Sequence, residues 1–142
     1  MTAVLDVSDL RIAFRQDGRV IEAVRGVSFT VGRGETVALV GESGSGKSVT
    51  ALSTVALLPD SATTAGSVRY QGREMLGAPE AELRRVRGND ISFIFQEPMT
   101  SLNPLHTIEK QLGESLLLHQ GLDGAAARAR IIDLLTKVGI RD

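Results

Sequence analysis

Alternating apolar and polar positions open the chain and predict antiparallel strands. The alternation runs from Leu5 to Phe14 with a shift of phase near Asp9, and it resumes over residues 27–31. Asp17-Gly18, between these two stretches, is typical of a hairpin turn. Residues 67–75 repeat the pattern on a smaller scale, with a turn expected at Gln71-Gly72. The first part of the chain is therefore expected to be built from hairpins.

Two continuous apolar runs predict a different kind of strand. Residues 36–40 and 91–95 are short, apolar and rich in β-formers, as buried strands of a parallel sheet are. The first run is followed by a helix-like pattern over 48–58, which ends before a proline. The second run ends at Gln96, and residues 97–104 hold two prolines and several turn formers. We expect a loop there, at the sheet edge where α/β folds bind ligands.

Helical periodicity dominates the rest of the chain. Helices are expected over 78–87, 107–120 and 124–138, the last two with one apolar face each, and the small polar residues 61–66 are expected to form a loop. The fold class predicted is α/β, with an antiparallel part, a core around the parallel strands and a helical part. The expected division is 1–35 and 66–76 for the antiparallel part, 36–58 and 89–96 for the core, and 105–142 for the helical part.

The segment between the first apolar run and its helix carries the chemistry. It reads Gly-Glu-Ser-Gly-Ser-Gly-Lys-Ser over 41–48, the spacing of a phosphate-binding P-loop. Glycines let successive backbone N–H groups turn toward a phosphate, the lysine adds a full positive charge, and the final serine hydroxyl is placed to ligate magnesium. The candidate nucleotide-binding residues are Gly41, Glu42, Ser43, Gly44, Ser45, Gly46, Lys47, Ser48 and the adjoining Val49.

Composition limits the classes of protein that remain. The 142 residues suit one domain, with 42% hydrophobic and 23% charged residues and a net charge of −1. This balance gives no support for a nucleic-acid partner. There is no cysteine, so disulfides and thiolate metal sites are excluded. No apolar run approaches the roughly 18 residues of a membrane span, so any membrane role would be peripheral.

With the hairpins, the P-loop and the run ending in Gln96 in place, the chain resembles the N-terminal part of an ABC transporter ATP-binding subunit. Residues 40–49 and 94–104 are similar to the Walker A and Q-loop segments of the oligopeptide and dipeptide importer branch. The first segment alone specifies only a P-loop nucleotidase. The second is more specific to peptide-type transporters, although nickel importers share much of it.

The resemblance implies roles for single residues and for partners. Lys47 would hold the β- and γ-phosphates of ATP, Ser48 and Gln96 would contact Mg²⁺ or its waters, and Phe14 would stack on adenine. An aromatic residue that ends an alternating strand also suits the core, so both interpretations of Phe14 stay open. The segment 96–104 would contact transmembrane permease subunits. A second ATP-binding subunit would complete the nucleotide site. The protein would lie at the cytoplasmic face of the cell membrane.

Three elements of the family pattern are missing from the sequence: the Leu-Ser-Gly-Gly-Gln signature, the Walker B Asp-Glu pair and the switch histidine. Residues 131–133 echo a Walker B, but their surroundings have helical period and no Glu follows Asp133. We therefore expect a truncated chain that binds nucleotide with little turnover and leaves apolar strand edges uncovered. The alternatives are an ABC-type ATPase that acts on DNA or ribosomes, and a non-functional remnant that binds nucleotide weakly or not at all.

Overall fold

The computed structural model describes residues 3–42, 44–97 and 100–141. They form two compact units, divided after Val86. None of the helices in these described ranges is both long enough and apolar enough to cross a membrane.

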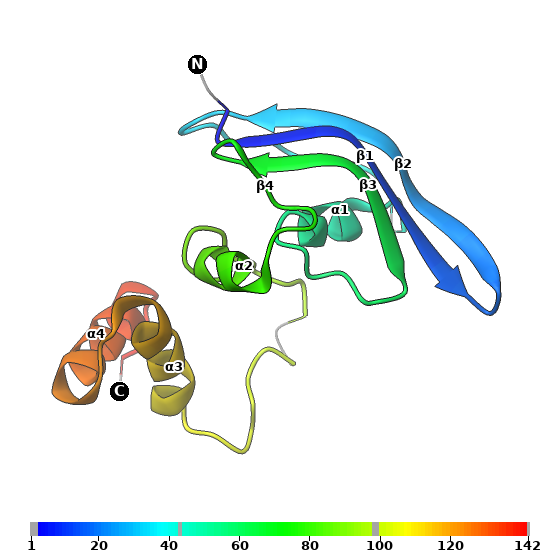
Figure 1. Cartoon of the computed structure of the whole chain (residues 1–142). Helices are drawn as coiled ribbons and strands as arrows, with labels where there is room; N and C mark the ends of the chain where they lie inside the picture. Colours follow the sequence, from blue (N-terminus) through cyan, green and yellow to red (C-terminus); the bar gives the residue numbers. More distant parts are fainter. Residues whose placement is uncertain (1–2, 43, 98–99, 142) are drawn as a thin grey trace. The chain divides into compact units, whose positions relative to one another are not determined.

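The first unit is built on an antiparallel sheet of four strands in the order β2-β1-β3-β4 (Figure 1). The strands are β1 (Leu5–Gln16), β2 (Arg19–Val31), β3 (Ala62–Tyr70) and β4 (Arg73–Glu74). The hairpins predicted at Asp17-Gly18 and Gln71-Gly72 are confirmed. The loop predicted over 61–66 is wrong, because these small residues pair with β1 from Ala62 onward and β1 supplies the backbone partners that their weak strand propensity does not reveal.

The phase shift predicted near Asp9 is a β-bulge in the central strand. Asp9 has a φ of 45°, and the pairing register shifts beside it toward both β2 and β3. Its backbone N–H donates to Ser28 Oγ at 2.8 Å instead of to a strand carbonyl. On the other side its carbonyl faces Gly66, where a Cβ atom would lie only 2.2 Å from the carbonyl oxygen. Only glycine fits opposite this bulge.

Two short helices complete the first unit. Helix α1 (Lys47–Ser53) contacts β1 and β2 and lies beneath the curved sheet, and α2 (Glu80–Val86) follows β4 (Figure 1). The helix expected over 48–58 ends early: Ala56 adopts a φ of 55°, and Leu57 N–H donates to the Leu52 carbonyl at 3.1 Å, which closes the last turn. The buried apolar side chains of this unit are Val7, Leu10, Ile12, Val24, Val55, Val68, Met75, Leu83 and Val86.

The second unit is a helical hairpin of α3 (Ile108–Gln120) and α4 (Gly124–Lys137). Thr107 caps α3, because its Oγ1 accepts a hydrogen bond from the Lys110 N–H at 3.1 Å. Gly121 ends the helix with a φ of 65°. The apolar faces predicted from periodicity meet in a small core, formed by Leu112, Leu116, Leu122, Ala127, Ile131 and Leu135.

The two apolar runs expected to be parallel strands are not strands in the structure. Residues 36–40 have no regular structure, and in 91–95 only Ile91 forms an isolated bridge, to Arg87. Val40 is 92% exposed and Ile94 is fully exposed. A strand is held by hydrogen bonds to a neighbouring strand, and the described part of each unit gives these runs no neighbour to pair with. Of the core expected over 36–58 and 89–96, the structure therefore contains the helix that follows the P-loop but not the two parallel strands.

Replacing Gly66 by alanine should destabilise the first unit more than replacing Gly72. Both residues have positive φ, which costs an alanine roughly 1–2 kcal/mol. Only at Gly66 would the new methyl group also collide with the Asp9 carbonyl, whereas at Gly72 it would meet no described atom within 4 Å. Urea unfolding of the two variants measures the difference, and equal losses of unfolding free energy would contradict the close approach.

Asp133 should titrate below its ordinary range. A hydrogen bond from Lys137 at 3.2 Å is the largest cause that lowers the pKa of this carboxyl, and Arg130 at 2.6 Å adds to it. Because the folded pKa is lowered, the stabilisation is present above the unfolded-state pKa and is lost as pH falls through the folded one. In NMR titrations, Lys137→Ala should raise the Asp133 pKa more than Arg130→Ala does; the reverse order would refute the assignment.

Candidate functional site

The P-loop forms a tight turn between residues 36–40 and helix α1. Gly44 and Gly46 have φ values of 81° and 94°, the left-handed conformation expected of glycines in such a loop. Ser45 N–H donates to the Glu42 carbonyl at 3.1 Å, which closes the turn. Ser43 lies outside the described residues. The positive φ angles expected of Gly44 and Gly46 are thus present, and binding of phosphate by the loop stays a prediction.

Gly46 brings the P-loop into direct contact with strand β2. A Cβ atom at this position would lie 2.8 Å from the Ala23 carbonyl oxygen and 3.2 Å from the Val24 side chain. On the helix side, both the backbone N–H and the hydroxyl of Thr50 donate to the Gly46 carbonyl, at 2.9 and 2.7 Å. The loop is therefore fixed between the sheet and the first turn of α1.

Lys47 holds its charge against the loop itself. Its ammonium group donates to the Gly41 carbonyl and, at 3.0 Å, to the Glu42 carbonyl. Ser48, the next residue, is exposed in the first turn of α1, and Val49 is half-buried. One short segment thus contains a positive charge, an exposed hydroxyl and a glycine-rich backbone. The charge and the backbone N–H groups suit a phosphate, and the hydroxyl oxygen suits a hard divalent cation.

A cleft of about 500 Å³ opens between the loop and β2. This volume lies in the range of small-molecule sites. Strand β2 supplies three apolar residues to the wall and also the charged pair Glu22 and Arg25, while the loop supplies the cationic Lys47. The cleft is lined by Glu22, Ala23, Val24, Arg25, Val27, Leu39, Val40, Ser45, Gly46, Lys47 and Thr50. The arrangement suits a ligand with one apolar end and one anionic end.

The β2 wall of this cleft is the part that the sequence did not reveal. Val24 is buried, but nothing in the sequence pattern says that the P-loop packs beside it. The only signal of that contact is Gly46, because a glycine at the end of the loop permits a close backbone approach.

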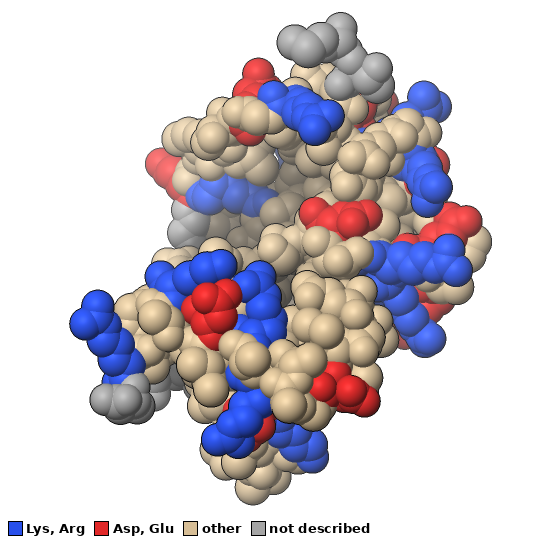
Figure 2. Space-filling view, turned by 90° about the vertical axis from the view of Figure 1, so that its left-hand side faces the viewer, with Lys and Arg blue, Asp and Glu red and all other residues tan. Residues whose placement is uncertain are grey.

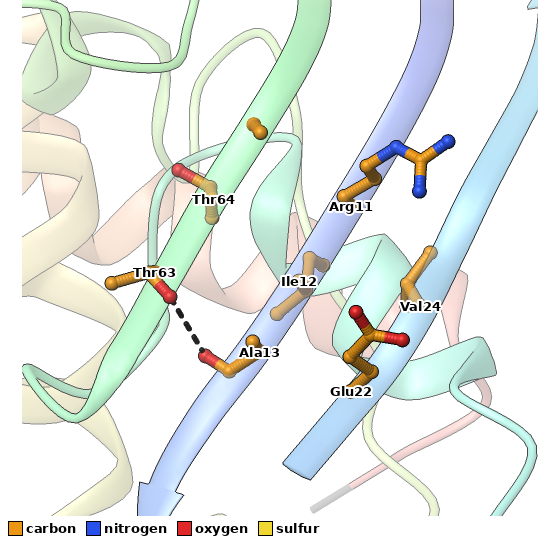
Figure 3. Close-up of a pocket in the computed structure, with 8 residues that line it drawn as sticks. Arg11, Ile12, Ala13, Glu22, Val24, Thr63 and Thr64 are labelled. Carbon is orange, nitrogen blue, oxygen red and sulfur yellow. Dashed lines mark hydrogen bonds between the residues drawn. The ribbon is translucent and has the colours of Figure 1, made fainter. Parts of the chain in front are cut away.

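A smaller hollow lies on the sheet across β1, β2 and β3 (Figure 3). Arg11 and Glu22 reach toward it from neighbouring strands, and Thr63 Oγ1 donates to the Ala13 carbonyl at 3.4 Å. Its volume of about 130 Å³ is below the range of small-molecule sites. It shares Glu22 and Val24 with the P-loop cleft but contains none of the loop residues.

Phe14 and Gln96, the other predicted site residues, are not among the residues that line the cleft. Phe14 is half-buried, pairs with Ile21 and lines a separate hollow of about 260 Å³ beside Asp60. The structure does not bring it to the P-loop, and its stacking on adenine stays a prediction. Gln96 is exposed in the second unit, and its role toward magnesium also stays a prediction. In the segment 96–104, Pro98 and Met99 lie outside the described residues.

The charges on the surface are mixed in sign. On the face in Figure 2, Lys and Arg side chains lie among Asp, Glu and uncharged residues. The described residues there form no single-sign field of the kind that steers a highly charged polymer. Among described residues, no group of three His, Cys, Asp or Glu side chains is arranged to hold a metal ion. A cation at this site would depend on a hydroxyl and on oxygens of its ligand.

The family that matches this chain and the proteins that are similar to it agree with one another. The sequence profile of the ABC transporter family matches residues 24–142. The chain is 59% identical to the peptidoglycan transport ATP-binding protein YejF of Agrobacterium fabrum, with 98% of this chain and 26% of that protein aligned. It is 48% identical to the oligopeptide transport ATP-binding protein OppD of Mycobacterium tuberculosis, over 99% of this chain and 23% of the relative.

The dipeptide transport ATP-binding protein DppD of Bacillus subtilis is 46% identical, over 100% of this chain and 43% of its own length. The chain thus spans about a quarter of the first two relatives and less than half of the third.

Gly46→Ala should displace the P-loop from β2, whereas Gly44→Ala should disturb the loop alone. Both substitutions force alanine into positive φ, but only the methyl group at residue 46 meets the Ala23 carbonyl; at residue 44 it meets no described atom within 4 Å. In NMR spectra, the amides of Ala23 and Val24 should shift in the first variant only. Equal shifts in both variants would show that the loop does not rest on the strand.

Proposed function

The chain belongs to the ABC transporter family, and we propose that it is an ATP-binding part of a transporter that couples ATP hydrolysis to peptide import. The observation that carries this proposal is the P-loop seated on β2, with Lys47 at its mouth and the cleft beside it. A nucleoside triphosphate has the chemistry that such a site accepts, since one end is aromatic and apolar and the other carries several negative charges.

Each part of the site has a role in this proposal. The backbone N–H groups of residues 41–46 and the Lys47 ammonium bind the β- and γ-phosphates. The Ser48 hydroxyl, together with phosphate oxygens and Gln96, holds Mg²⁺, which neutralises charge on the phosphates. The apolar wall of β2 around Val24 and Val27 contacts the nucleoside. Oxygen donors of this kind fit magnesium, which prefers few protein ligands and keeps several waters.

The partners and the solute follow from the relatives. Their names assign them to the transport of peptidoglycan, oligopeptides and dipeptides, so peptides are the proposed solute class. Transmembrane permease subunits are the proposed partners of the segment 96–104, and a second ATP-binding subunit is proposed to complete the nucleotide site. The protein would act at the cytoplasmic face of the cell membrane.

Hydrolysis by this chain alone should be weak. Attack on the γ-phosphate needs a group that positions the water as well as groups that hold the phosphates. The 142-residue sequence has no Asp-Glu pair after an apolar strand, no Leu-Ser-Gly-Gly-Gln segment and no switch histidine. We therefore propose that the chain binds Mg-ATP with little turnover.

Calorimetric titration with Mg-ATP tests the proposal, with hydrolysis measured on the same samples. Lys47→Ala should weaken binding by at least about tenfold, since a charge-assisted contact contributes about 1.5–3 kcal/mol. Lys110→Ala is the matched control, because Lys110 is exposed on α3 in the second unit. Absence of Mg-ATP binding by the unmodified chain, or equal affinities of the two variants, would refute nucleotide binding by this loop.

A further inference from the structure

Thr50 is a buried threonine whose hydroxyl is bonded to the last glycine of the P-loop. It is only 4% exposed and lies in α1, among the residues that line the cleft. The hydroxyl donates to the Gly46 carbonyl at 2.7 Å, and the Thr50 backbone N–H donates to the same oxygen at 2.9 Å. A hydroxyl has one hydrogen to donate, and this one is used. Any effect of the Thr50 hydroxyl on a ligand therefore passes through Gly46.

The hydroxyl bond is a second restraint on a carbonyl that already has a partner. The backbone N–H of Thr50 supplies the ordinary helical hydrogen bond to Gly46. A valine side chain would fill the same space without a polar group that needs a partner. What the hydroxyl adds is control over the direction of the carbonyl. Such control matters most at a glycine, which has no side chain to limit backbone rotation.

The direction of the Gly46 carbonyl decides the direction of the next N–H group. A trans peptide is planar, so its C=O and N–H groups point to opposite sides. The Gly46 carbonyl is turned into α1, and the Lys47 N–H is therefore turned away from the body of the helix. Rotation of this one peptide would exchange the two groups and present a partly negative oxygen where an N–H group had been.

Two other carbonyl groups of the loop depend on a partner that a ligand would take. The carbonyls of Gly41 and Glu42 accept hydrogen bonds from the Lys47 ammonium. An anion that draws the ammonium group to itself removes this partner from both of them. The bonds to the Gly46 carbonyl come from Thr50 in α1, so the same event leaves them in place.

We propose that Thr50 is a positioning residue for phosphate binding, whose hydroxyl keeps the peptide between Gly46 and Lys47 turned with its N–H toward the anion. This rests on the proposed function, which makes a nucleoside triphosphate the ligand of the loop. A donor that is already oriented before the ligand arrives lowers the free-energy cost of binding. Loss of the hydroxyl should therefore reduce the affinity for ATP.

Helix α1 leads directly to a matched control, Thr54 at its C-terminal end. Thr54 is 7% exposed, and its hydroxyl donates to the Ala51 carbonyl at 2.7 Å. It is not among the residues that line the cleft. Threonine hydroxyls in helices commonly bond a carbonyl three or four residues earlier. Thr54→Val thus removes a bond of the same kind and length without touching the P-loop.

Calorimetric titration with Mg-ATP tests the positioning role. Thr50→Val keeps the shape of the side chain and removes the hydroxyl, and it should weaken binding by about fivefold, the effect of one hydrogen bond. Thr50→Ser and Thr50→Ala differ from each other by the hydroxyl alone, so the serine variant should bind as the wild type does and the alanine variant as Thr50→Val does. Thr54→Val should keep wild-type affinity.

Three results would overturn the proposal: wild-type affinity in both variants that lack the Thr50 hydroxyl, equal affinities of the serine and alanine variants, or an equal loss in Thr54→Val. The serine and alanine pair decides the question even if Thr50→Val does not fold.

NMR of the nucleotide-free chain separates this proposal from the proposed function. Thr50→Val should shift the Lys47 amide and the Gly46 carbonyl carbon, and Thr54→Val should leave both signals in place. Unchanged signals in Thr50→Val would overturn the positioning role, whether or not the wild type binds Mg-ATP. Shifted signals in a chain whose wild type binds no Mg-ATP would instead refute the proposed function, and the phosphate role with it.

Discussion

The pairing of β1 with a strand on each side is the interaction on which the first unit depends. β1 is hydrogen-bonded to β2 along one edge and to β3 along the other, so residues from three separate parts of the chain meet on it. Its inward side chains Val7, Leu10 and Ile12 are almost completely buried. The bulge at Asp9 bends this strand, and the glycine opposite it lets β3 follow the bend. Without β1, helix α1 would lose one of the two strands that it packs against.

The position of the candidate site depends on that sheet. Strand β2 is paired with β1, and its Ala23 carbonyl lies close against Gly46. Helix α1, which carries Lys47 and Ser48, begins directly after Gly46. The geometry of the loop is therefore supported on its β2 side by long-range strand pairing and on its helix side by the contacts of Thr50. This explains how a loop can hold its shape although the apolar residues 36–40 that precede it form no strand.

The sequence reveals those parts of the structure that local chemistry decides. The turns at Asp17-Gly18 and Gln71-Gly72 and the two long helices follow from residue type and periodicity. The left-handed glycines of the P-loop follow from its spacing. The predictions from the sequence fail where a distant part of the chain, and not the local residues, decides the secondary structure. The small residues 62–65 become a strand because β1 lies beside them. The strongly β-forming residues 91–95 do not, because the described part of their own unit contains no strand for them to pair with. Likewise, nothing local in Val24 reveals that it lines a cleft with the P-loop.

The bond between Lys47 and its own loop makes ligand binding an exchange. In the structure the ammonium group is already satisfied by the Gly41 and Glu42 carbonyls, so an arriving ligand gains only the difference between its own attraction and theirs. A neutral or singly charged group offers little more than two carbonyl dipoles do. A polyphosphate offers several full negative charges at once. A ligand that takes the Lys47 ammonium must therefore compete with both carbonyl groups, and a group with several full negative charges competes better than a neutral or singly charged one.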